Sequence, residues 1–213
     1  MKFTKDTTKV KAFSGGFIKE TGFYPCTITK CYEQKSTKTL SEAIHFEVVT
    51  DSGAIGRFDL WVVGREGTSV DKNGKELSAI GDVNDLMVLL ELDEMTSKPG
   101  KVKVYDFDLK QDIEQRKMVF HDVIDRQIGI VFDMRPNTYN GKTTMRPEFA
   151  GFYDAETEQS ASEFLNKEEP VQMRRNIDYL LGTSKAQAQP NSPQNSSPVD
   201  PVSMEFDEYN IPF

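Results

Sequence analysis

Cationic and aromatic side chains recur along this 213-residue chain at spacings suited to holding an unpaired nucleic-acid strand. Arg57 and Trp61 are four residues apart, so in an extended strand both side chains lie on the same face. A cationic groove binds the phosphates of a single strand, and aromatic rings stack on its bases whatever the sequence. We therefore predict a single-stranded DNA-binding site that draws on Lys30, Tyr32, Lys35, Lys38, Arg57, Trp61, Arg65, Arg135, Tyr139, Lys142 and Arg146.

Each of these residues also has a simpler interpretation. An isolated lysine or arginine is usually a solvated surface charge, and a single tryptophan such as Trp61 can be buried beneath an N-terminal arm or a helix. Residues 1–20 have several lysines and a small aromatic cluster at Phe13 and Phe17, and this arm either lies across DNA or is solvated. The grouping of the residues, and not any one of them, favours nucleic-acid binding.

The sequence gives little support for catalysis. His45 and His121 are far apart and do not have the spacing of metal ligands. Asp106, Asp108 and Asp112 could hold a divalent ion, as a nuclease needs, but they lack the glycine and final glutamate of a calcium loop, and a solvated acidic edge explains them better. There is no phosphate-binding glycine-rich loop and no nucleophile elbow. We expect no enzymatic activity, no cofactor and no metal.

A second kind of site is predicted at the C-terminus. No lysine or arginine follows Lys185, and the last ten residues combine acidic side chains with aromatic rings. Such a segment cannot bury enough apolar surface to fold alone, and it either aids solubility or is bound by a partner. A partner would take the last ring in an apolar pocket, pair an arginine with the terminal carboxylate and hold the acids at a basic rim. The predicted partner-binding residues are Phe206, Asp207, Glu208, Ile211, Pro212 and Phe213.

This ending resembles the C-terminal peptide of bacterial single-stranded DNA-binding proteins, in which an acidic run is followed by Ile-Pro-Phe. Tyr209 and Asn210 depart from the family, which usually has further acids there. The body of the chain does not begin like the bacterial proteins, so it is more similar to a phage-encoded single-stranded DNA-binding protein. The matching positions are Met204, Phe206, Asp207, Glu208, Ile211, Pro212 and Phe213.

The resemblance implies a protein that coats single-stranded DNA without sequence specificity during replication, recombination or repair. It also implies that the acidic tail recruits proteins of those processes. The alternative is an interaction adaptor that recruits or inhibits host replication proteins through the tail, with a barrel that binds protein.

The elements that must position these residues are mainly strands. Residues 23–32, 44–48 and 55–63 alternate apolar and polar side chains, which indicates a three-stranded antiparallel meander. A helix is expected from Asp82, and residues 101–120 are strand-like but poorly patterned. The remaining signals are a strand at 128–134, a hairpin at Asn140-Gly141 that returns through 142–153, and short helices at 157–167 and 171–181.

This order predicts an OB-fold, a five-stranded partly open Greek-key barrel with a helix between strands 3 and 4, although an SH3-like barrel or a small sandwich shares much of the pattern. Residues 1–182 would form the DNA-binding domain. Residues 183–213 have five of the ten prolines and no glycine, which predicts a disordered linker and acidic tail. In an OB-fold the loops after the first strand and between the last two strands flank the binding face, so we expect the cationic residues to converge.

Charge and cysteine content give further limits. The net charge of −8 counts against nucleic-acid binding, which usually accompanies a basic excess, but a local cationic stripe is sufficient. Cys26 and Cys31 are five residues apart, an offset that places them on opposite faces of one strand and argues against a disulfide. With no signal peptide and no apolar run of transmembrane length, we expect a cytoplasmic location in bacteria, including a phage-infected host.

Overall fold

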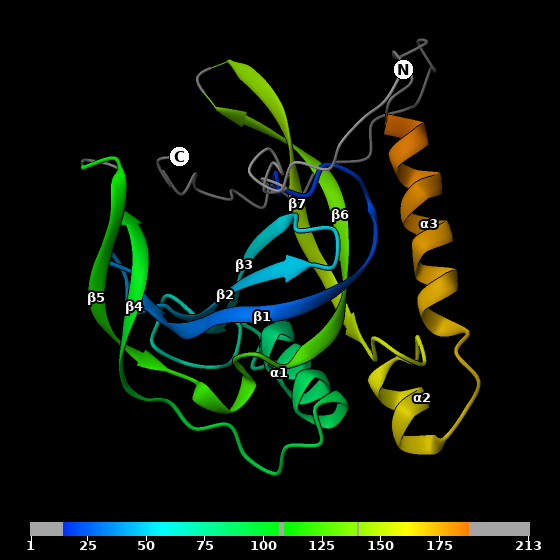
Figure 1. Cartoon of the computed structure of the whole chain (residues 1–213), viewed down its shortest axis with the longest axis horizontal. Helices are drawn as coiled ribbons and strands as arrows, with labels where there is room; N and C mark the ends of the chain where they lie inside the picture. Colours follow the sequence, from blue (N-terminus) through cyan, green and yellow to red (C-terminus); the bar gives the residue numbers. More distant parts are fainter. Residues whose placement is uncertain (1–14, 107–108, 140, 188–213) are drawn as a thin grey trace, which may run out of the picture.

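The computed structural model of the chain describes residues 15–106, 109–139 and 141–187, and these form a mainly β molecule. Seven strands make one antiparallel sheet, and helices lie beside it (Figure 1). The elements in chain order are β1 (Gly22–Lys35), β2 (Glu42–Thr50), β3 (Ile55–Val63), α1 (Ser78–Leu89), β4 (Lys98–Asp106), β5 (Gln111–Val119), the 3-10 helix η2 (His121–Val123), β6 (Gln127–Tyr139), β7 (Lys142–Tyr153), α2 (Ala161–Asn166) and α3 (Gln172–Gln187).

The first three strands form the predicted meander, in which β1 pairs with β2 and β2 with β3. Their inner faces supply much of the core: Ile28, Phe46 and Phe58 are all buried in one cluster. Leu86 of α1 belongs to the same cluster, so α1 covers the inner side of the sheet. The period-two pattern of the sequence therefore identified the buried side of β2, of β3 and of β1 as far as Ile28.

The last two strands close the sheet on its other side. β6 pairs with the first half of β1, from Gly22 opposite Phe132 to Thr27 opposite Gln127. β7 returns beside β6 and also contacts β3, so the sheet curves around the core. The hairpin predicted at Asn140-Gly141 is confirmed by the pairing of Tyr139 with Lys142, and Gly141 has a φ of 73°, which glycine adopts without strain.

The prediction of five strands was wrong, because β4 and β5 form an additional hairpin between α1 and β6. Only one side of this hairpin is partly covered: Val102 and Val119 are buried, whereas Lys101 and Arg116 on the other side are exposed. Half-covered strands that also have charged residues on their inner side give a weak alternating pattern. This explains why residues 101–120 looked strand-like but irregular.

The prediction that the two cysteines lie on opposite faces of one strand was wrong, because β1 contains a β-bulge. The pairing with β2 shifts between Ile28 and Lys30, which leaves Thr29 as an extra residue. The extra residue reverses the alternation, so Cys26 and Cys31 are both buried in the same core cluster instead of facing opposite sides. Both cysteines are nevertheless free, and burial raises the pKa of the Cys26 thiol to about 12.

Helix boundaries also differ from the predictions. α1 begins at Ser78 and not at Asp82, and α2 begins after Ser160, whose hydroxyl accepts the backbone N–H of Glu163 in a capping box. α3 continues past Gly182 to Gln187, because a glycine inside an exposed helix costs only about 1 kcal/mol relative to alanine. Met173 of α3 packs with Val131 and Tyr153 on the outer side of the sheet.

None of the helices in the described part of the chain has the length and apolar character needed to cross a membrane.

Candidate nucleic-acid interface

The outer surface of β1, β2 and β3 is built from cross-strand rows of side chains. Residues that pair directly in antiparallel strands project from the same side of the sheet, so each row can be read from the register. Lys30, Glu47 and Arg57 form one row. Two residues further along each strand, Tyr32, His45 and Asp59 form the next row, and Gln34, Ala43 and Trp61 form the third. We call these three rows the outer face.

Glu47 joins the two cations of the first row. Lys30 Nζ lies 2.9 Å from Glu47 Oε1, and Arg57 Nε donates to Glu47 Oε2 at 2.6 Å. Burial acts to raise the pKa of Glu47, but the hydrogen bonds and charges of its two partners outweigh it, so the pKa is lowered. The row has two cations and one anion, a net charge of +1, and its cations are held at fixed positions.

Tyr32 in the second row does not present its ring to solvent. Only 4% of the residue is exposed, because Val102 and Val119 of the β4–β5 hairpin pack against it. The ammonium of Lys117 also lies 5.6 Å from the centre of the ring. The sequence prediction that Tyr32 contributes to a stacking surface is therefore not supported by its position.

His45 and Asp59 complete this row. His45 Nδ1 lies 2.7 Å from Asp59 Oδ1, and the imidazole is tilted against the Tyr32 ring with the ring centres 4.7 Å apart. Both residues are partly exposed. The contacts with Asp59 and Tyr32 fix the orientation of the His45 imidazole in the middle of the outer face.

Trp61 in the third row is partly exposed, so it is not a core residue. It projects from the same side of β3 as Arg57, as its spacing predicts. Lys35 lies at the same end of the sheet, where its ammonium pairs with Glu42 at 2.7 Å. Lys38 is exposed in the loop between β1 and β2, and Arg65 is exposed just after β3.

The other four predicted residues lie on the β6–β7 hairpin. Arg135 pairs with Arg146 and Tyr139 pairs with Lys142, so the register places all four on one side of this hairpin. Arg135 Nε donates to Asp133 Oδ2 at 2.8 Å. The eleven predicted residues thus fall into two groups, one on or beside the outer face and one along the β6–β7 hairpin.

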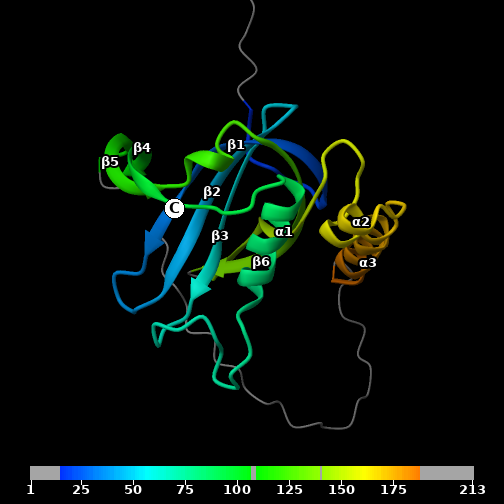
Figure 2. The same cartoon turned by 90° about the horizontal axis from the view of Figure 1, so that it is seen from below.

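The two hairpins, β4–β5 and β6–β7, rise on the same side of the sheet (Figure 1). α1 lies on the opposite side, as the turned view also shows (Figure 2). Because Tyr32 of the outer face packs against the β4–β5 hairpin, the side on which the hairpins rise is the side of the outer face. Along β1, the Lys30–Glu47–Arg57 row lies between the segment that pairs with β6 and Tyr32, where the β4–β5 hairpin is attached, and the row of Trp61 lies beyond Tyr32.

Sequence reasoning missed several residues of this surface. His45, Glu47 and Asp59 alternate with the buried residues of β2 and β3, so the strand period could have identified them. Phe17 and Lys117 gave no such signal, because their neighbours come from distant parts of the chain. The Arg57 guanidinium lies 5.5 Å from the centre of the exposed Phe17 ring, and Lys117 lies above Tyr32.

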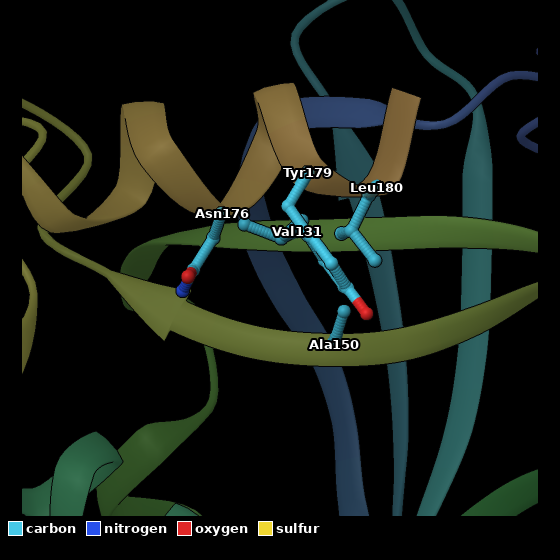
Figure 3. Close-up of a pocket in the computed structure, with 5 residues that line it drawn as sticks. All are labelled: Val131, Ala150, Asn176, Tyr179 and Leu180. Atoms are coloured by element: carbon cyan, nitrogen blue, oxygen red, sulfur yellow. The ribbon is translucent and has the colours of Figure 1, made fainter. Parts of the chain in front are cut away.

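A small pocket lies elsewhere, between α3 and the β6–β7 strands (Figure 3). Its volume is about 120 Å³. It has no acid–base group other than a tyrosine, and it is separate from the outer face. The pocket is lined by Val131, Ala150, Asn176, Tyr179 and Leu180.

No group of three or more histidine, cysteine, aspartate or glutamate side chains in the described part of the chain could hold a metal ion. Asp112 is exposed on β5, whereas Asp108 and the side chain of Asp106 lie outside the described residues, so the acidic cluster of the nuclease hypothesis is not tested. The tail residues Phe206, Asp207, Glu208, Ile211, Pro212 and Phe213 also lie outside the described residues.

No protein-family model matches this chain, and no curated protein matches its sequence significantly.

Proposed function

We propose that this chain is a non-enzymatic single-stranded DNA-binding protein whose body is an OB-fold. The order β1, β2, β3, α1, β6 and β7 supports the fold, because β6 lies beside β1 and β7 contacts β3, as a five-stranded Greek-key barrel requires. The β4–β5 hairpin is then an insertion between the helix and the fourth barrel strand. In this fold oligonucleotides bind on the face of strands 2 and 3 and between the loops that follow strand 1 and strand 4.

The observation that carries the proposal is the placement of Lys30, Arg57 and Trp61 on one face of the sheet. Glu47 holds both cations in place, yet each keeps further N–H donors for phosphate oxygens, because an ammonium has three donors and a guanidinium five. The side chains of Arg57 and Trp61 are about 13 Å apart along the strand. A single strand crossing the face can therefore place a phosphate at Arg57 and stack a base on Trp61.

The tail supplies the second part of the proposal. The acidic segment that ends in Ile211, Pro212 and Phe213 recruits replication, recombination or repair proteins, and the linker lets it reach them while the body stays on DNA. This part rests on the sequence resemblance of the tail. It predicts that partner capture and DNA binding are separable.

A titration that uses the fluorescence of the single tryptophan, Trp61, tests the proposal. Oligo-dT should quench the fluorescence and bind with micromolar or tighter affinity, whereas a duplex of equal length should bind more weakly. Between two salt concentrations the logarithm of the affinity should fall by about 0.7 per phosphate contact per logarithmic unit of salt. Binding that prefers duplex DNA, or that ignores salt, would contradict the proposal.

The adaptor hypothesis is kept as a second candidate, because Glu47 neutralises part of the charge of the outer face and the whole chain has a net charge of −8. If it is correct, the protein will not bind oligo-dT even at low salt, but a tail peptide and the full chain will bind the same replication protein. The same titration therefore separates the two candidates.

A further inference from the structure

The β4–β5 hairpin has two sides of different character. The register places Val102, Val104, Ile113 and Lys117 on one side, and these residues are buried or partly covered. Lys101, Lys103 and Arg116 on the other side are exposed, together with Met118. We call the first side the inner side of the hairpin, because Val102 packs on Tyr32 of the outer face.

The hairpin is attached to the sheet only near its base. In the described residues, β5 pairs with β1 at one position, Val119 opposite Tyr32, and the N–H of Phe120 donates to the carbonyl of Cys31. From this base the two strands extend away from the sheet on the side of the outer face (Figure 1). Val104 and Ile113, further from the base, stay partly exposed on the inner side.

Lys117 lies where the inner side meets the outer face. Its ammonium donates to Gln34 Oε1 at 3.3 Å and lies 5.6 Å from the centre of the Tyr32 ring. Both neighbours are uncharged, and no carboxylate pairs with Lys117 among the described residues. Lys101 on the other side differs, because it forms an ion pair with Glu114 at 2.7 Å. Lys117 therefore has its full charge available at the edge of the outer face.

Charge complementarity indicates the occupant of this surface. The segment 98–119 has six lysine or arginine residues against four acidic residues, a net charge of +2 in a chain of −8. Of the six cations, the register places Lys98 and Lys117 on the inner side, where the described side chains include no carboxylate. A polyanion is thus attracted to this hairpin, and the apolar side chains of Val104 and Ile113 can contact bases while Lys117 contacts a phosphate. A protein with an acidic surface would share the charge attraction, but the unpaired bases of a single strand also supply flat apolar faces for Val104 and Ile113.

We propose that the inner side of the β4–β5 hairpin is a wall of the DNA-binding surface and that Lys117 contacts a phosphate of the single strand that crosses the outer face. This inference rests on the proposed single-stranded DNA binding. It adds a contact that the sequence did not suggest, and it assigns the two lysines of one hairpin, Lys117 and Lys101, to different roles.

The test compares three variants of the full chain, Lys117→Gln, Lys117→Arg and Lys101→Gln, in binding to labelled oligo-dT across a range of salt concentrations. The two glutamine variants remove the same charge from the same hairpin, so a general electrostatic effect would be equal in both. Lys117→Gln should weaken binding about tenfold, as expected for one charge-assisted hydrogen bond. It should also lower the salt slope by about 0.7, the value for one phosphate contact.

Lys117→Arg should keep the affinity and slope of the unmodified protein, and Lys101→Gln should stay within about twofold of it. Thermal unfolding of each variant establishes that the fold is intact. Equal effects of Lys117→Gln and Lys101→Gln would overturn the proposal, and so would a loss of affinity with an unchanged slope, since Lys117 would then act only by packing on Tyr32. If the unmodified protein binds no single-stranded DNA, the proposed function itself fails, and this outcome is distinct from the others.

Discussion

Two aromatic residues of the outer face, Trp61 and Tyr32, should respond in opposite ways to substitution. Both were predicted from the sequence to contribute to a stacking surface. The structure leaves Trp61 partly exposed at one end of the outer face, whereas Tyr32 is 4% exposed beneath the β4–β5 hairpin. We therefore expect Trp61→Ala to affect binding and Tyr32→Leu to affect stability.

The magnitudes follow from these positions. Stacking on a base contributes about 1–3 kcal/mol, so Trp61→Ala should weaken oligo-dT binding by roughly 5- to 150-fold. Its cost in stability should be about 1 kcal/mol or less, since the side chain is not in the core. Tyr32→Leu keeps an apolar side chain against Val102 and Val119 but changes its shape, which should cost about 1–2 kcal/mol in stability.

Anisotropy of a labelled oligo-dT measures binding in both variants, because it does not depend on tryptophan fluorescence. Urea unfolding, followed by circular dichroism, measures stability. Lys101→Gln is a suitable control, because it removes an exposed charge from the side of the β4–β5 hairpin that faces away from both rings.

The reasoning is refuted if Tyr32→Leu weakens binding as much as Trp61→Ala while the protein stays equally stable. That result would mean that the hairpin moves away and the Tyr32 ring stacks on a base. Unchanged binding in Trp61→Ala, with an intact fold, would instead remove Trp61 from the binding surface.

Three further predictions concern the rest of the chain. Glu163 accepts the backbone N–H groups of Ser160, Val171 and Gln172; burial acts to raise its pKa, but these hydrogen bonds hold it at about 2. The lowered pKa stabilises the fold above about pH 4.5, and this contribution is lost as the pH falls towards 2. Glu163→Gln should therefore cost about 2 kcal/mol at pH 7 in urea unfolding and much less near pH 2, and an equal cost at both pH values would contradict the assignment. Gly129→Ala should lower stability by about 1–3 kcal/mol in the same assay, because a Cβ there would overlap the buried Tyr153 ring; a neutral result would mean that the ring can move. Deletion of residues 211–213 should abolish binding of partner proteins in a pull-down and leave oligo-dT affinity within about twofold, and loss of both activities would show that the tail is part of the fold.

Local patterns were sufficient where one side of a strand is fully buried. The inner residues Phe46 and Phe58 were identified from alternation alone, and the strand 55–63 was predicted with the bounds that β3 has. The hairpin at Gly141 was found because a tight turn needs a residue that tolerates positive φ. These features depend only on residues that are close in the sequence, so they can be predicted from local patterns.

The remaining features depend on contacts between distant segments. Tyr32 alternates correctly with the core residues, but only the β4–β5 hairpin determines that its outward ring is covered. Lys117 reaches the outer face from β5, and Phe17 reaches it from the segment that precedes β1. No local period in the sequence indicates either contact. The Glu47 pairings likewise require three strands to be in register before they can be recognised.

Thr29, the extra residue of the bulge, determines which side chains of the second half of β1 lie on the outer face. If the chain were one residue shorter between Ile28 and Lys30, the second half of β1 would turn over. The ammonium of Lys30 would then point among the phenyl rings, and the Cys31 thiol would point to water. Substitutions along this strand can exchange one cation for another, but a single deletion would exchange the buried and exposed side chains of the second half of β1. The length of β1 is therefore under a stricter constraint than most of its individual side chains.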